Sequence, residues 1–170
     1  SGSASSFVVN RNLSFGNGYK SLTTTVDNSA YVYSSDTTKL TLNSTYNVTV
    51  DFDVYLKTGY KTMVCLRETS SGPITAAVKA DTSWKYWNGT SYASTGTGLS
   101  YDMWNHVQLV LDCSAKTYKI IVQPVGSMPK VLGTYSWDPG TVAGDQVFFA
   151  IHPDGNTGEK VCFDNVVVTY

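Results

Sequence analysis

The chain has 170 residues, of which 15% are charged, and its formal net charge at pH 7 is −1. Nucleic acids and anionic membrane surfaces are bound through clustered positive charge, so this balance argues against both as partners. No apolar run approaches the roughly 20 residues that a membrane helix needs. The length fits one domain with a core: we expect residues 1–6 to be an expression scar or linker and residues 7–170 a single domain.

The residue composition favours strands over helices. The chain contains 19 serines, 21 threonines and 12 tyrosines but only two glutamates, Glu68 and Glu159. Threonine, tyrosine and valine are enriched in strands, whereas glutamate is among the better helix formers. The sequence therefore predicts an all-β protein.

Apolar and polar residues alternate with a period of two in the first clear strand, residues 46–57. One face carries the apolar residues Val48, Val50, Phe52, Val54 and Leu56. The other face carries Asp51, Asp53 and Tyr55. Because successive side chains of a strand point to opposite faces, the first set is expected in the core and the second at the surface.

The next hairpin is predicted at Asn88-Gly89, between strands at 78–87 and 90–93. A two-residue turn there pairs Trp87 with Thr90, and it places Trp87, Lys85 and Tyr92 on one face. Trp84 and Tyr86 then face the core. Trp87 and Tyr92 are candidates for an exposed aromatic platform, with ordinary hairpin packing as the alternative.

Residues 104–112 and 117–123 predict a second hairpin, and two late strands are expected at 146–152 and 160–170. In the first of these strands His106 and Gln108 point outward, opposite Val107 and Leu109. About ten short strands without a helical period predict two stacked antiparallel sheets, a β-sandwich of jelly-roll type. A barrel of the same size is the structural alternative.

The three cysteines, Cys65, Cys113 and Cys162, are widely spaced and show no metal-binding spacing. They are expected to be either three buried thiols or one disulfide with one buried thiol.

Two segments resemble known secreted sandwiches. Residues 101–112 (YDMWNHVQLVLD), continued by KTYKI at 116–120, resemble a strand and hairpin of laminin-G-like and concanavalin-like domains. Residues 161–168 (VCFDNVVV) resemble the closing strand of many jelly-roll modules, including carbohydrate-binding modules. The resemblance implies a non-catalytic accessory module of a secreted polysaccharide-degrading enzyme, or a cell-surface domain, in which Trp104 packs inside.

The same resemblance implies a structural Ca²⁺ where the first and last strands meet. Asp164 and Asn165 match the closing motif. The other oxygen ligands would come from the start of the chain, Asn10, Asn12 or Asn17, or from the turn that carries Asp27. The alternative is a surface Asp-Asn pair that hydrogen-bonds a neighbouring loop.

Sugars present C–H faces flanked by hydroxyls, so their sites combine aromatic rings with planar polar groups. Trp87, Tyr92 and Trp137 are the candidates for stacking, with Lys85 beside them. The alternative for Trp137, at the edge of a loop, is a lid over the end of the sandwich. A second candidate site is the polar face of the sheet, for which the residues are Asp51, Asp53, Tyr55, Arg67, His106, Gln108 and His152. The alternative for this face is an ordinary solvated surface.

Catalysis has weaker support in the sequence. The two glutamates lack the spacing of sandwich glycoside hydrolases. A polysaccharide lyase would use Arg67, a histidine (His106 or His152) and Tyr118, but only fragments of the alginate-lyase motifs are present.

The expected function is binding of a polysaccharide, most simply a plant cell-wall glycan, by a secreted, monomeric module of a multidomain protein. This module would keep an attached enzyme near its substrate. The alternatives are an adhesion or spacer domain and, third, the lyase.

Overall fold

The computed structural model of the chain describes residues 7–10, 21–25, 32–33, 40–42, 47–67, 72–141, 146–153 and 160–169. All regular structure in these ranges is β-strand, and every pairing within them is antiparallel. They contain no helix long and apolar enough to cross a membrane.

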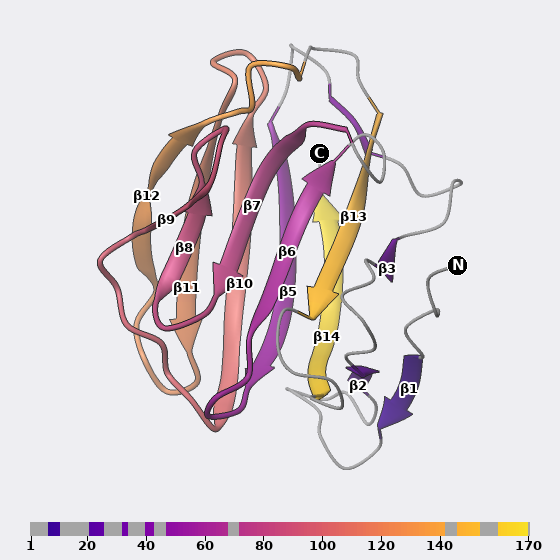
Figure 1. The fold of residues 1–170 in the computed structure, drawn as a ribbon, viewed down its shortest axis with the longest axis vertical. Coiled ribbons are helices and arrows are strands. Elements are labelled where there is room, and N and C mark those ends of the chain that lie inside the picture. Colours follow the sequence, from indigo (N-terminus) through magenta and orange to yellow (C-terminus); the bar gives the residue numbers. More distant parts are fainter. Residues whose placement is uncertain are drawn as a thin grey trace.

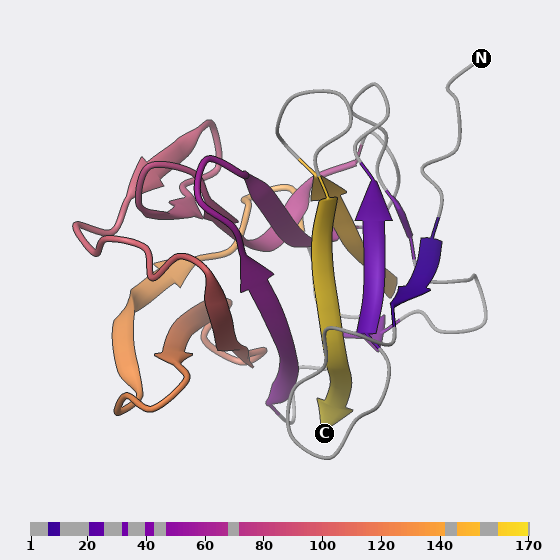
Figure 2. The ribbon, with the colours of Figure 1, turned by 90° about the horizontal axis from the view of Figure 1, so that it is seen from below.

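The first sheet, which we call sheet A, has the strand order β1-β2-β14-β5-β10-β11-β12. Its strands are β1 (Phe7–Asn10), β2 (Ser21–Thr25), β14 (Lys160–Thr169), β5 (Val48–Leu56), β10 (Met103–Asp112), β11 (Thr117–Pro124) and β12 (Lys130–Ser136). Figure 2 shows β5, β14, β2 and β1 side by side, with β12 (orange) at the opposite edge.

The second sheet, sheet B, has the order β3-β13-β6-β7-β8-β9, and β4 also pairs with β13. Its strands are β3 (Val32–Tyr33), β13 (Gln146–Pro153), β6 (Thr62–Arg67), β7 (Ile74–Ala80), β8 (Trp84–Trp87), β9 (Tyr92–Ser94) and β4 (Leu40–Thr41). Figure 1 shows β6, β7 and β8 in front of β5, β10 and β11. The two sheets are therefore stacked, and they have open edges rather than closing into a barrel.

The core lies between the sheets and follows the predicted alternation. The main apolar cluster takes Phe52, Val54 and Leu109 from sheet A, and Leu66 and Val78 from sheet B, all nearly inaccessible to solvent. The polar residues between them along the strands lie on the faces turned away from the other sheet. We call the outer face of sheet A the A face and that of sheet B the B face. The predicted antiparallel jelly-roll β-sandwich is confirmed.

One of the two predicted hairpins is confirmed, and the other differs from the prediction. The β10–β11 hairpin has the expected pairing, with His106 opposite Gln123. The expected strand 78–87 is wrong as one element: it breaks at 81–83, and Ala80 pairs with Trp84 across two antiparallel strands. The register after Asn88 is also wrong, because Trp87 pairs with Tyr92 across a four-residue loop. Asn88 stabilises that loop by accepting two backbone hydrogen bonds on its side-chain oxygen.

Candidate functional site

The predicted site residues divide between the two outer faces of the sandwich. Asp51, Asp53, Tyr55, His106 and Gln108 belong to the A face, where β5 pairs with β10. The B face takes the other described candidates, Arg67, Lys85, Trp87 and Tyr92, through β6, β8 and β9. The core separates the two groups, so they do not form one site.

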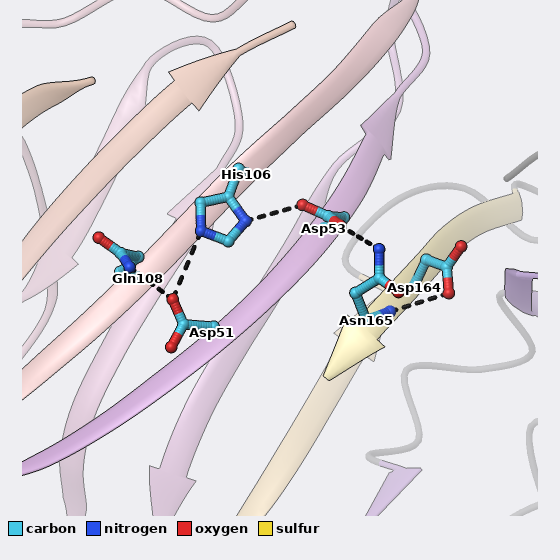
Figure 3. Close-up of polar contacts among 6 residues, drawn as sticks. All are labelled: Asp51, Asp53, His106, Gln108, Asp164 and Asn165. Atoms are coloured by element: carbon cyan, nitrogen blue, oxygen red, sulfur yellow. Dashed lines mark hydrogen bonds and ion pairs between the residues drawn. The ribbon is translucent and has the colours of Figure 1, made fainter. Parts of the chain in front are cut away.

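His106 lies at the centre of a polar network on the A face. Its Nδ1 is 2.8 Å from Asp53 Oδ1, and its Nε2 is 3.4 Å from Asp51 Oδ1 (Figure 3). Asp53 is 1% exposed, whereas the side chain of His106 is 31% exposed. A buried carboxylate thus fixes the orientation of a ring that remains accessible from the A face.

Two amide side chains complete this network from both sides. Gln108 Nε2 donates to Asp51 Oδ1 at 2.5 Å, and Asn165 Nδ2 donates to Asp53 Oδ2 at 2.7 Å. Asn165 reaches β5 because β14 has an irregular register after Asp164, and because Asn165 adopts the left-handed conformation with φ = 50°. Figure 3 shows the resulting chain of contacts across β10, β5 and β14.

An aromatic pair lies next to the network. Trp104 pairs with Tyr55 across β10 and β5, and their rings pack edge to face with centroids 5.7 Å apart. Trp104 is buried, as expected, but it belongs to the A face and not to the core cluster between the sheets. Trp104 lies two residues before His106 and four before Gln108 on the same strand, so alternation alone would have placed it on the A face.

Among the described residues, two hollows open on the A face. One, of about 350 Å³, is lined by His106, Gln123, Pro124, Val125 and Gly126. The other, of about 300 Å³, is lined by Asn47, Val110, Asp112, Thr117, Lys119 and Thr134. Of these residues, His106 alone was a site candidate on the basis of the sequence. The first hollow is mainly apolar and the second mainly polar.

On the B face, the aromatic side chains are packed rather than presented as a flat platform. Trp87 and Tyr92 are half-buried, with ring centroids 5.2 Å apart, against a small cluster that includes Cys65. The Trp87 indole donates to Asp138, and the Tyr92 hydroxyl donates to the sulfur of Met63. Ordinary hairpin packing, the alternative left open for Trp87 and Tyr92, accounts for these contacts.

The charged B-face candidates are engaged in similar structural contacts. Lys85 forms an ion pair with Asp81 at 2.7 Å. Arg67 is buried, and its guanidinium donates to the carbonyl of Gly72.

The last two interpretations concern Trp137 and the residues considered for a lyase. Trp137 is no stacking residue: it is 4% exposed and belongs to the core cluster, and its indole donates to the carbonyl of Thr117. The lyase residues also do not meet. Tyr118 is fully buried in the core, and Arg67 lies on the sheet opposite His106. Tyr118 is therefore out of reach of a substrate at the surface. The other candidate histidine, His152, belongs to β13, which pairs with the Arg67 strand β6.

The structure bears on two further predictions, the state of the cysteines and the calcium ligands. All three cysteines are buried thiols that form no disulfide, which agrees with the first of the two alternatives. Within the described ranges no three His, Cys, Asp or Glu side chains are grouped to hold a metal. Asp164 Oδ1 accepts a hydrogen bond from the Asn165 backbone, so this pair alone offers far fewer than the six to eight oxygens that Ca²⁺ takes.

Five residues keep their predicted roles as predictions: Asn10, Asn12, Asn17 and Asp27 as calcium ligands, and His152 as a sugar-binding residue. The backbones of Asn10 and His152 belong to β1 and β13, where His152 pairs with Met63, and Asn12, Asn17 and Asp27 lie outside the described residues.

No protein-family model matches the sequence, and no curated protein matches it. Solved structures do match its fold. A GH131 β-glucanase catalytic domain from Podospora anserina aligns with 89% of this chain and 72% of its own, at a TM-score of 0.60 and 13% identity. A sialidase aligns with 88% of this chain at a TM-score of 0.59 and 12% identity, and the chain spans 15% of its length.

A lectin, UEA-II in complex with galactose, aligns with 88% of this chain and 85% of its own, at a TM-score of 0.56 and 9% identity. At these identities the similarity establishes the fold and no shared activity. The same sandwich occurs in a catalytic domain and in a lectin, so function has to be inferred from the site.

Proposed function

We propose that the protein binds a carbohydrate chain on its A face without cleaving it. The observation that carries the proposal is the fixed polar network around His106, which lies beside the Tyr55–Trp104 pair and opens into a hollow. The lectin and glycosidase folds among the similar structures support a sugar as the ligand.

The network suits sugar hydroxyls because its side chains are held in place before a ligand arrives. Asp51 and Gln108 are bonded to each other and are both partly exposed, so they offer acceptor and donor atoms in a fixed arrangement. The half-buried ring of Tyr55 offers an apolar surface for a sugar C–H face. Since each sugar also loses hydroxyl hydration on binding, we expect Kd values of roughly micromolar to millimolar.

The same geometry supports binding rather than glycoside hydrolysis. Hydrolysis needs two carboxyl groups that face one bond. Asp53 is buried, and both of its oxygens accept hydrogen bonds from His106 and Asn165. Asp53 therefore orients its neighbours and does not face a ligand as an acid or base.

We extend the proposal to the setting of the domain: a secreted, monomeric accessory module that holds an attached enzyme on a plant cell-wall polysaccharide. A calcium ion at Asp164 and Asn165 stays a prediction. Binding assays with and without a chelator test it directly.

The test is affinity electrophoresis in gels that contain glucans, mannans, xylans or galactans, with reducing-sugar release measured in parallel. We expect one polysaccharide to retard the wild-type protein without product release. Tyr55→Ala and Gln108→Ala should abolish the retardation. The matched variant Tyr92→Ala removes the same ring from the B face and should leave it unchanged.

Each other result overturns a defined part of the proposal. Loss of retardation in Tyr92→Ala, with Tyr55→Ala unaffected, would move the site to the B face. Release of reducing ends would make the domain an enzyme. Failure of every polysaccharide to retard the protein would leave the adhesion or spacer domain as the better explanation.

A further inference from the structure

The two hollows of the A face are aligned along the same strand pair. His106 pairs with Gln123 beside the first hollow, and Val110 pairs with Lys119 at the second. His106 and Val110 are four residues apart on β10, which corresponds to roughly 13 Å along a strand. His106, Gln108 and Val110 are spaced two residues apart on β10, so their side chains point to the same face. Both hollows therefore open on the same side of the sandwich.

An apolar strip connects the hollows. Gln108 pairs with Ile121, and Ile121 pairs with Val131 on β12. Val131, near the start of the edge strand β12, is 56% exposed, so its side chain is open to contact. Along the strands, the A face therefore presents the His106 network with the mainly apolar first hollow, then Ile121 and Val131, and then the mainly polar second hollow.

The second hollow has unused hydrogen-bonding groups. Lys119 and Thr134 are both exposed and pair with each other across β11 and β12. Neither side chain forms a hydrogen bond or an ion pair with any residue in the described part of the chain. Thr117 and Asp112 lie across from each other at the far end of the same hollow.

We infer that the second hollow is a distal subsite for the same glycan, so that the protein takes a linear chain of several sugars lying along β10 and β11. This inference rests on the proposed function and adds its ligand class: an internal stretch of an extended chain, not a single terminal sugar. The polar groups of the hollows would bond hydroxyls, and Ile121 and Val131 would contact the C–H faces between them.

The test compares oligosaccharides of increasing length by titration calorimetry. Cello-, laminari-, xylo- and manno-oligosaccharides, each from disaccharide to hexasaccharide, are titrated into the protein alongside the polysaccharide gels. We expect affinity to rise with length. Lys119→Ala and Thr134→Ala should each weaken the longest ligand by roughly threefold to tenfold, the effect of one lost hydrogen bond, and leave the disaccharide unchanged. Lys61→Ala, a lysine beside β6 that pairs with Asp81, is the control and should change neither.

The outcomes separate this inference from the proposed function. If the wild-type protein binds a disaccharide as tightly as a hexasaccharide, or if both distal variants bind the hexasaccharide normally, the distal subsite is wrong while sugar binding stands. If no oligosaccharide and no polysaccharide binds, the proposed function fails and the subsite fails with it.

Discussion

Asp53 is the residue on which the A-face network depends. It is buried on the outer side of a sheet, a position where a carboxylate would normally be solvated. The His106 ring and the Asn165 amide replace that water with two side-chain hydrogen bonds of 2.8 and 2.7 Å. Removing such a carboxylate is costly because its buried hydrogen-bond donors then have no acceptor.

We therefore expect Asp53→Ala to lower the free energy of unfolding by about 2–4 kcal/mol, measured in urea. The substitution leaves the His106 and Asn165 donors without their acceptor. Asp51→Ala is the comparison, because Asp51 is 20% exposed and water can replace it. It should cost about 1 kcal/mol or less. Equal losses for the two variants would show that Asp53 has no special structural role.

Cys65 gives a second prediction at the residue scale. Burial raises the pKa of its thiol from 9.0 to about 12, and the charge of Arg67 opposes the rise only in part. The unfolded chain thus loses this proton above pH 9 while the folded chain keeps it until about pH 12. Stability from this group is complete below pH 9 and is lost as the pH rises toward 12.

The measurement is urea unfolding between pH 8 and 11 in the presence of a reductant. The free energy of unfolding of Cys65→Ala should fall less steeply with pH than that of the wild-type protein. The difference in slope should correspond to at most one proton released on unfolding. Identical pH slopes for the two proteins would mean that the thiol is not held protonated by the fold.

At the scale of elements, alternation predicted which side of a strand faces the core but not which sheet a strand joins. Val107 and Leu109 are buried and His106 and Gln108 are partly exposed, as expected. Alternation predicts that Arg67 and His106 both point outward, but a sandwich has two outward faces, and these residues lie on different ones. Sheet membership depends on pairings between distant segments, such as β14 with β5, which local periodicity does not encode.

Trp137 shows the same limit at the end of a strand. It follows β12, where alternation stops, and its burial depends on hydrogen bonds to the backbone of residues 116 and 117. Nothing in the local pattern Tyr-Ser-Trp-Asp-Pro distinguishes this anchored indole from an exposed one.

Strand β12 contains a glycine whose small size is required. Gly133 has φ = 154°, and a Cβ there would lie 2.5 Å from the hydroxyl oxygen of Tyr135. The Tyr135 ring stacks on Tyr86 of the other sheet, with centroids 3.7 Å apart. Gly133→Ala should therefore displace this ring and cost about 1–3 kcal/mol in urea unfolding, with a changed near-ultraviolet circular dichroism spectrum.

Gly98→Ala is the matched control, because no atom lies within 4 Å of a Cβ at that position. It should unfold like the wild-type protein. A Gly133→Ala variant with unchanged stability and spectrum would contradict the packing described for β12.

At the scale of the whole molecule, the sandwich places its proposed binding face and its packed aromatic hairpin on opposite sides of one core. The sheets adhere mainly through apolar packing. Tyr118 adds a polar connection: its side chain belongs to β11 of sheet A, and its hydroxyl donates to the Trp87 carbonyl of sheet B at 2.9 Å. The Trp87 amide donates back to the same hydroxyl at 3.1 Å.

This connection leads to a prediction on the cohesion of the two sheets. Burial raises the pKa of Tyr118 well above its ordinary value, so the hydroxyl remains protonated and can donate at all ordinary pH. Tyr118→Phe keeps the ring but leaves the Trp87 amide without its acceptor, which should cost about 1–3 kcal/mol in urea unfolding. Tyr101→Phe also removes a hydroxyl that donates to a backbone carbonyl, that of Asp81, but at a half-buried position where water can substitute. It should cost less than about 1 kcal/mol. Similar losses in the two variants would mean that the hydroxyl contact contributes nothing particular to holding the sheets together, and that apolar packing alone does so.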